Sequence, residues 1–351
     1  MKVSNLTDVR GIEIQDALEP RVVTPSDVLI EMKRVGVCGS DIHYYTDGAI
    51  GSQLVQYPWT AGHEGAGVVR EVGAAVKRVK VGDRVAFDPC ISCGTCDQCV
   101  RGRRHTCRHQ TFLGCPGQAP GCLAERIVLP AECCYPVPDS LTFDDAALVE
   151  PLSIAVHAVN LAGSLAGLSV GILGAGPIGL CTLAVAKVDG PAQVFVTDKI
   201  DRRVDAARQG GADWAGNPDQ VDVVAVVGEL CPLQLDVVFE CTGDQAAIDQ
   251  AITLLAPGGK LMLVGIPGGH NRISMEINQL RRKEICVQNV RRQNECVDRA
   301  IDLIASGKVD IRYLLTHHFP FAKTRDAFEL VAGYRDGVLK AMIELAQDSA
   351  P

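Results

Sequence analysis

The sequence predicts an α/β protein in which a domain of alternating strands and helices is inserted into a small β-barrel domain. Short β-type runs separated by turn residues occupy residues 1–87, as is typical of a barrel. Strand-like and helix-like segments then alternate from Ser153 to about Val287. A closing β run at Leu339–Leu345 is expected to return to the first domain. We therefore predict domain segments at 1–153, 154–287 and 288–351.

Individual segments support both halves of this prediction. In the barrel, strand-like runs are expected at Val28–Met32, Ala61–Gly73 and Val81–Phe87. In the inserted domain, strands are expected at Gln193–Thr197, Asp236–Cys241, Lys260–Val264 and Ile285–Val290, with helices at Leu180–Lys187 and Asp244–Leu255. Glu295–Ser306 has the pattern of an amphipathic helix, and the tail Gln347–Pro351 is predicted to be disordered.

The bulk composition excludes several classes of function. A chain of 351 residues is long enough for two domains, and its net charge of −8 argues against nucleic-acid binding. The stretch Glu150–Lys187 is almost free of charge, yet Asn160, Pro177 and several glycines divide it, so we expect a buried core segment rather than a membrane span. The 15 cysteines and the absence of an apolar signal region predict a reducing, cytoplasmic environment.

The inserted domain opens with the stretch Ser169–Gly179, SVGILGAGPIG. A short apolar run is followed by Gly174, Gly176 and Gly179 in the spacing G-x-G-x-x-G, and then by a helix-length apolar segment. Strand, glycine turn and helix in this order are typical of dinucleotide binding, because the glycines let the backbone approach a pyrophosphate at the helix N-terminus. The motif alone is also compatible with an ordinary glycine turn.

An acidic residue makes the dinucleotide interpretation more specific. Asp198 directly follows the expected strand Gln193–Thr197, where a carboxylate can bind both ribose hydroxyls of NAD and repel the 2′-phosphate of NADP. The sequence therefore favours NAD. Arg203 lies nearby and either contacts the adenosine end of the cofactor or is an ordinary surface arginine.

Four cysteines in a short segment, residues 90–108, predict a metal lobe. Their spacing is C-x₂-C-x₂-C-x₇-C, formed by Cys93, Cys96, Cys99 and Cys107. Four thiolates on one loop can fill every position of a tetrahedral zinc ion, which makes such a site structural. An iron–sulfur cluster is the alternative that the spacing allows.

Spacing alone does not assemble a second metal site from residues as far apart as Cys38, His63, Glu64 and Glu150. The chain, however, resembles the zinc-dependent medium-chain dehydrogenase/reductase family, and within it the polyol (sorbitol/xylitol) dehydrogenases. The resemblance covers nearly the whole chain and rests on GVCGSDIHYY, GHEGAG, VGDRVAFDP, the four-cysteine lobe, LVEPLSIAVHA, GAGPIG, LAPGGKLMLVG and LLTHHFPFAKTRDAFE. It implies a GroES-like β-barrel catalytic domain with an inserted Rossmann domain.

The resemblance also implies a catalytic zinc site. Cys38 and His63 would bind the metal, and Glu64 would be a direct ligand in at least one state. Glu150 stands where alcohol dehydrogenases of the family carry cysteine, and in the polyol type this carboxylate meets zinc directly or through water. A mixed set of nitrogen, sulfur and oxygen ligands with one exchangeable position suits catalytic zinc.

The resemblance assigns further residues to the proton route, the substrate and the cofactor. The proton released on oxidation would leave through Ser40 and His43, or else through water and Glu150, and the sequence does not choose between these routes. A turn role for Ser40 and a packing role for His43 remain alternatives. Tyr44 and Arg291 match residues that contact polyol hydroxyls, whereas Arg292 replaces an aromatic residue. Along the cofactor the resemblance places Pro177, Ile178, Val264, Gly265, Ile266 and Val290.

The leading hypothesis is thus zinc- and NAD-dependent oxidation of a secondary polyol hydroxyl to a ketose. L-Threonine dehydrogenase or another zinc alcohol dehydrogenase is the enzymatic alternative, although Tyr44–Gly51 looks more like the polyol branch. A non-catalytic dinucleotide-binding protein is the alternative from another class. From the resemblance we also expect a homodimer or homotetramer.

Overall fold

The computed structural model describes residues 1–267 and 272–345, so the predicted disorder of Gln347–Pro351 lies outside the described residues. The chain forms two compact units. The first unit contains Met1–Glu150, Val297–Gly307 and the chain from Leu315 onwards, and the second contains Pro151–Cys296 and Lys308–Leu314. The β-barrel unit is therefore discontinuous in sequence.

The boundaries differ from the predicted 1–153, 154–287 and 288–351. Residue 287 falls inside the last strand of the second unit, β18 (Cys286–Asn289), whose register with the preceding strand continues to Asn289. The second unit therefore extends to Cys296. At the other boundary the division falls within α3 (Phe143–Ala162), a single helix with Pro151 in its interior.

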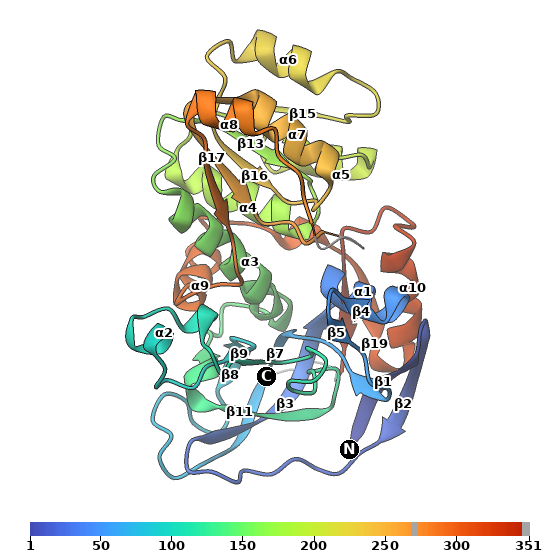
Figure 1. Ribbon diagram of the computed structural model, residues 1–351. Coiled ribbons are helices and arrows are strands. Elements are labelled where there is room, and N and C mark those ends of the chain that lie inside the picture. The colour runs from blue at the N-terminus through green and yellow to red at the C-terminus, as the bar shows by residue number, and fades with distance from the viewer. Residues whose placement is uncertain (268–271, 346–351) are drawn as a thin grey trace. The chain divides into compact units, whose positions relative to one another are not determined.

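The first unit is built on a seven-stranded sheet, which Figure 1 shows in blue and green with a red contribution from the C-terminal part of the chain. Six strands follow in the order β12-β8-β7-β3-β20-β19, and β11 also pairs with β3. Their bounds are β3 Asp27–Gly36, β7 Glu64–Val72, β8 Arg84–Phe87, β11 Arg126–Pro130, β12 Cys134–Pro136, β19 Leu315–Pro320 and β20 Lys340–Glu344.

Two features of this sheet position the site. In β3 the apolar side chains of Val28, Ile30 and Met32 alternate into the core, as a half-buried strand requires. The C-terminal end of β3 lies between β7 and β20, with Gly36 opposite both Glu64 and Met342. The closing β run predicted at Leu339–Leu345 is thus confirmed as strand β20, which pairs with the C-terminal end of β3.

Smaller elements complete the first unit. The short strands are β1 Lys2–Asp8, β2 Gly11–Asp16, β4 Ala49–Ile50, β5 Gln53–Leu54, β6 Trp59–Thr60, β9 Cys90–Ile91 and β10 Thr111–Phe112. The helices are α1 Gly39–Asp47, α2 Asp97–Val100, α9 Val297–Ala305 and α10 Thr324–Ala332, with 3₁₀ turns η1 Arg104–Thr106, η2 Ala131–Cys133 and η4 Phe321–Lys323. Helices α1 and α10 pack through Tyr45 and Phe328, whose rings meet edge to face with centroids 5.4 Å apart.

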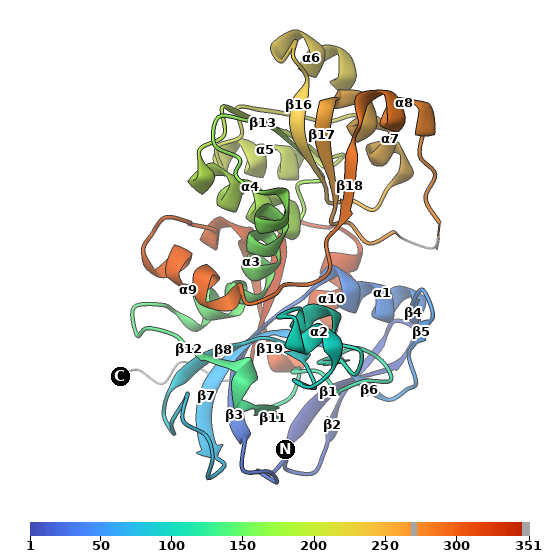
Figure 2. The ribbon, with the colours of Figure 1, turned by 60° about the vertical axis from the view of Figure 1, so that its left-hand side comes forward.

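The second unit is a doubly wound parallel sheet in the order β15-β14-β13-β16-β17-β18, which confirms the predicted Rossmann arrangement. Figure 2 shows α4 and α5 on one face of the sheet and α7 and α8 on the other. The strands are β13 Ser169–Leu173, β14 Gln193–Thr197, β15 Trp214–Gly216, β16 Leu235–Glu240, β17 Leu255–Leu263 and β18. The helices are α4 Pro177–Asp189, α5 Asp201–Gln209, α6 Val223–Leu230, α7 Gln245–Leu254 and α8 Ile277–Lys283, with η3 at Arg312–Leu314.

Strand order reverses between β13 and β16, and ligands of such sheets bind at this reversal, beyond the carboxyl ends of the strands. The uncharged stretch after Glu150 proves to be part of α3, β13 and α4, with most of its side chains buried in this unit. Within the described parts of the chain, the helices lack the combination of length and apolar character needed to cross a bilayer.

Candidate active site

The predicted catalytic metal site lies where β3 ends and α1 begins. Cys38 occupies the N-cap position of α1, and its backbone N–H donates to the Asp41 carboxylate at 3.2 Å. The same carboxylate accepts a hydrogen bond from the backbone N–H of Gly62 at 3.1 Å and is fully buried. Asp41 therefore joins the Cys38 turn to the segment that carries His63 and Glu64.

The structure brings Cys38, His63 and Glu64 together. One donor atom from each side chain lies within 4.8 Å of the other two, and both His63 and Glu64 are buried. Asp41 Oδ1 lies 3.4 Å from Nδ1 of His63, which leaves Nε2 as the ring nitrogen for a metal. This mixed sulfur, nitrogen and oxygen set matches the donor chemistry of catalytic zinc.

The electrostatics of the cluster also fit a cation. Burial lowers the pKa of His63, but the charges of Asp41 and Cys38 and their hydrogen bonds raise it more, so that its pKa lies well above the usual value. Surroundings that favour a proton on His63 favour a metal ion for the same reason, because both put positive charge among buried anionic groups.

Glu150 is near these residues without belonging to the three-residue donor group. It lies on α3 and is buried, and burial raises the pKa of its carboxyl to about 8, with His63 lowering and Glu64 raising that value. These influences show that Glu150 lies within electrostatic range of the cluster. Direct contact of Glu150 with the metal and contact through water both stay predictions.

The two residues of the expected proton route contact different groups. Ser40 Oγ donates to Cys38 Sγ at 3.4 Å, which places this hydroxyl beside the metal donors. His43 Nδ1 lies 3.1 Å from the carboxylate of Asp47, one turn later on α1, and its side chain is 37% exposed. His43 therefore stands on the solvent side of the helix, where a proton could pass to water.

Tyr44 points into the first unit rather than toward solvent. Its hydroxyl donates to Gln53 Oε1 at 3.1 Å, and Gln53 Nε2 donates to Cys115 Sγ at 3.0 Å. Phe112 packs against the imidazole of His63, with ring centroids 5.4 Å apart. These contacts hold the Tyr44 hydroxyl and the His63 ring in fixed orientations.

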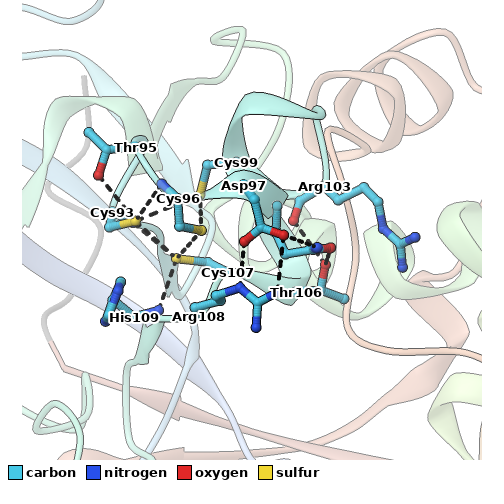
Figure 3. A network of polar contacts seen from close by, with 11 residues as sticks. Cys93, Thr95, Cys96, Asp97, Cys99, Arg103, Thr106, Cys107, Arg108 and His109 are labelled. Atoms are coloured by element: carbon cyan, nitrogen blue, oxygen red, sulfur yellow. Dashed lines mark hydrogen bonds and ion pairs between the residues drawn. The ribbon is translucent and has the colours of Figure 1, made fainter.

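The predicted structural metal site is the four-cysteine lobe, shown in Figure 3. The sulfur atoms of Cys93, Cys96, Cys99 and Cys107 lie 3.4–4.0 Å apart in the pairs that approach most closely. Tetrahedral zinc with Zn–S bonds of about 2.3 Å requires sulfur separations of about 3.8 Å. The four donors therefore have the spacing of a closed, structural zinc site.

Backbone groups of the lobe support thiolate ligands. Hydrogen bonds from the backbone of Thr95 and Cys96 lower the pKa of Cys93 to about 5. The backbone N–H of His109 donates to Cys107 Sγ at 3.4 Å. Cys90 accepts a hydrogen bond from Gln110 and stands outside the four-sulfur group.

The glycine motif of the second unit has the geometry that its sequence predicts. Gly174 has a φ of 101°, and a Cβ at Gly179 would lie 1.8 Å from the Gly174 carbonyl oxygen. Only glycine fits that close contact between turn and helix. Gly176 forms the N-cap of α4 and Pro177 is its first residue, so the helix N-terminus with Ile178 follows the carboxyl end of β13 directly.

Asp198 follows the carboxyl end of β14 beside the glycine turn. Its carboxylate accepts backbone N–H groups from Ala175 at 2.8 Å and Ile200 at 2.9 Å, and each oxygen keeps a lone pair for a ribose hydroxyl. Arg203 lies 3.8 Å from Asp198 and is close to Gly176, so it is near the turn rather than on a distant surface.

The remaining predicted cofactor residues follow the carboxyl ends of neighbouring strands. Val264 and Gly265 donate their backbone N–H groups to the Glu240 carbonyl at 2.8 Å, and Ile266 is 52% exposed. Val290 comes directly after β18, and Arg291, which follows it, is exposed. The structure thus places these residues directly after the carboxyl ends of β17 and β18, on the same side of the second unit's sheet.

Two polar residues of the first unit's site were absent from the predictions. Asp41 stands three residues after the N-cap Cys38, a spacing that could have revealed a capping interaction. Lys340, whose Nζ contacts the Glu64 carboxylate, is far away in sequence and had no such signal.

Comparison with known proteins agrees with this architecture. The model of the alcohol dehydrogenase GroES-like domain matches residues 24–139, and that of the zinc-binding dehydrogenase matches residues 177–306. The sorbitol dehydrogenase of Bacillus subtilis (strain 168) is 35% identical over 344 residues, covering 98% of this chain and 97% of the relative. The chain belongs to the zinc-binding dehydrogenase family.

Other members show how varied this zinc-binding dehydrogenase family is. L-Idonate 5-dehydrogenase of Vitis vinifera is 32% identical over 348 residues, covering 97% of this chain and 93% of the relative. An Escherichia coli oxidoreductase/dehydrogenase of unknown specificity has a similar structure, with a TM-score of 0.92, 31% identity and 99% of each chain covered. This zinc-binding dehydrogenase shares its fold with proteins of different substrates, so its substrate must be argued from its own site.

Proposed function

We propose that this zinc-binding dehydrogenase oxidises a secondary hydroxyl of a polyol to a ketose and transfers the hydride to NAD. The observation that carries the proposal is the convergence of Cys38, His63 and Glu64 on one point, separate from the closed four-cysteine lobe. Three ligands leave a position for a substrate oxygen. When bound there, zinc supplies a Lewis acid that favours the alkoxide form of a substrate hydroxyl.

The chain's own residues then have distinct tasks. Cys38 and His63 hold the metal, Asp41 fixes the ring of His63, and the Tyr44 hydroxyl binds a second hydroxyl of the polyol. Ser40 lies beside Cys38, and its hydroxyl can accept the proton of the reacting hydroxyl while it passes its own proton on toward His43, which stands where a proton reaches solvent. Glu150, with a pKa raised to about 8, offers the second route, through water.

The second unit supports NAD as the hydride acceptor. The glycine turn and the N-terminus of α4 suit a pyrophosphate, and Asp198 suits the two free ribose hydroxyls of NAD. A 2′-phosphate at Asp198 would put two anionic groups together, which favours NAD over NADP. We place Pro177, Ile178, Val264, Gly265, Ile266 and Val290 along the cofactor and Arg203 at its adenosine end.

The polyol class is favoured by the relatives. A sorbitol dehydrogenase and an L-idonate 5-dehydrogenase each match nearly the whole chain, and both names denote enzymes that act on polyhydroxylated substrates. The pair Arg291 and Arg292 adds two guanidinium groups after β18, and Arg292 adopts a φ of 53°. Two positive charges there would suit a longer or an acidic sugar. The pair therefore favours a sugar acid as the substrate.

A substrate panel tests the proposal directly. Sorbitol, xylitol, L-idonate and L-threonine are compared by kcat/KM with NAD and with NADP, in enzyme of measured zinc content. We expect the highest kcat/KM with a polyol or sugar acid and with NAD. Turnover of L-threonine alone would support the threonine dehydrogenase alternative, and two zinc ions per chain without turnover of any alcohol would support a non-catalytic protein.

We further propose a cytoplasmic homodimer or homotetramer. In the described residues all 15 cysteines are free thiols, which fits a reducing compartment. Strand β18 ends the six-stranded sheet, and Cys286 on this edge strand is exposed, so the edge can pair with a second copy. Sedimentation gives the mass of the assembly. A disulfide that mild oxidation forms between the Cys286 residues of two copies would place β18 at the interface.

A further inference from the structure

A buried lysine contacts one of the proposed metal ligands. Lys340 Nζ, on β20, forms an ion pair with Glu64 Oε2, and both side chains are only 1% exposed. The same ammonium donates to the Val37 carbonyl at 3.3 Å, directly before Cys38. The lysine therefore lies behind the ligand segment and inside the core of the first unit.

The backbone around this ion pair leaves room for it. Gly36 lies opposite Glu64 in β7 and opposite Met342 in β20. A Cβ at Gly36 would lie 2.4 Å from Glu64 Oε2 and 3.0 Å from Lys340 Cε. Any larger residue at position 36 would displace the carboxylate from the lysine, so the pair depends on a glycine in the strand between its two members.

We propose that Lys340 is a positioning residue that competes with the catalytic metal for the Glu64 carboxylate and so keeps one ligand position of that metal exchangeable. The inference rests on the proposed catalytic zinc site. A buried carboxylate requires a cationic partner, and here two candidates are within its reach. With Lys340 present, Glu64 can leave the metal without losing its counterion, and the vacated position can take a substrate oxygen.

Removal of the lysine charge has a definite consequence. In Lys340→Met the Glu64 carboxylate keeps the metal as its principal cationic partner, so it should bind the metal permanently. The metal then gains a tighter ligand set and loses the position that Glu64 would otherwise vacate, while the fourth position stays open. We expect the catalytic metal to leave at least tenfold more slowly into a chelator, and kcat to fall, whereas Lys340→Arg retains the charge and should restore both properties.

The test follows the metal itself as well as activity. The catalytic zinc is exchanged for Co²⁺, whose visible absorption reports the number and type of ligands, and the rate of metal loss to a chelator is measured. The variants are Lys340→Met, Lys340→Arg and the double variant Lys340→Met/Glu64→Gln. Lys33→Met is the matched control, because Lys33 is a buried lysine of the neighbouring strand β3 that pairs with Glu31 at 2.8 Å.

The inference predicts a changed Co²⁺ spectrum and slower metal loss in Lys340→Met alone, with values like those of the unmodified enzyme in Lys340→Arg and Lys33→Met. In the double variant the slowing should disappear, because the neutral amide that replaces the Glu64 carboxylate is a much weaker metal ligand. An unchanged spectrum and rate in Lys340→Met would overturn the inference, and so would faster metal loss. If the unmodified enzyme binds no metal beyond that of the four-cysteine lobe, the proposed function itself fails.

Discussion

Asp41 Oδ1 lies 3.4 Å from Nδ1 of His63, and both side chains are buried in the first unit. The contact fixes one ring nitrogen and presents the other to a metal. A carboxylate in this position also raises the basicity of the imidazole, which strengthens a metal–nitrogen bond. The pair therefore couples the N-terminal turn of α1 to the metal donors.

The first prediction follows from this pair. Asp41→Asn keeps the shape of the side chain but removes its charge, and we expect the affinity for the catalytic zinc to fall about tenfold or more. Competition with a chelator measures the affinity. Asp47→Asn, on the same helix, removes only the partner of His43 and is the matched control. Equal zinc affinity in the two variants would show that Asp41 does not support the metal site.

The second prediction concerns the lobe of Cys93, Cys96, Cys99 and Cys107. Cys96→Ser should remove one zinc per chain and lower the melting temperature, because the binding energy of a structural metal contributes to folding. Cys90→Ser changes a cysteine of the same lobe that is not a ligand, and its zinc content should stay normal. Zinc is counted by atomic emission. A Cys96→Ser protein that retains its full zinc content would exclude the four-sulfur site.

The third prediction tests the choice of cofactor. Loss of the carboxylate in Asp198→Ala should shift the ratio of kcat/KM for NAD to that for NADP about tenfold to a hundredfold toward NADP, since hydrogen bonds to a charged group contribute about 1.5–3 kcal/mol. Asp201→Ala removes an equal charge nearby, from a carboxylate that binds Asn217 and Gln220. A shift of the same size in this control would mean that net charge, rather than Asp198, sets the preference.

The fourth prediction addresses the substrate. Tyr44→Phe removes one hydroxyl, and kcat/KM for the polyol should fall about threefold to tenfold, the usual range for one hydrogen bond. The KM for NAD should not change. Tyr45→Phe is the control on the same helix, because the Tyr45 hydroxyl binds Glu329 and the Arg10 carbonyl instead. The value of kcat/KM is obtained from initial rates at varied polyol concentrations. An unaltered kcat/KM in Tyr44→Phe would show that Tyr44 does not bind the substrate.

Local sequence patterns predicted the second unit well. The strand after the glycine turn was placed at Gln193–Thr197, as observed, and the four cysteines converge as their spacing required. These features depend on residues that are neighbours along the chain. The start of α3 was not predicted, although Thr142 and Asp145 form a reciprocal hydrogen-bonded cap at its N-terminus that is visible in the sequence.

Local sequence patterns did not predict the metal site of the first unit. Cys38, His63 and Glu64 are held together by β3, β7 and the Asp41 hydrogen bonds, and only the family resemblance suggested their association. Lys340 reaches Glu64 because β20 joins the sheet next to β3, a pairing between distant parts of the chain. Strand order in a sheet, unlike ligand spacing on a loop, leaves no local trace in the sequence.

The most direct test of the central claim is the turnover number of His63→Ala with a polyol and NAD. Loss of a ligand of the catalytic metal should lower kcat by about a thousandfold or more, the effect of several kcal/mol of transition-state stabilisation. The affinity for NADH, measured by fluorescence in the same preparation, should stay within about twofold, because the proposed cofactor residues belong to the second unit. Near-normal turnover by His63→Ala would contradict the assignment of Cys38, His63 and Glu64 as the catalytic metal site.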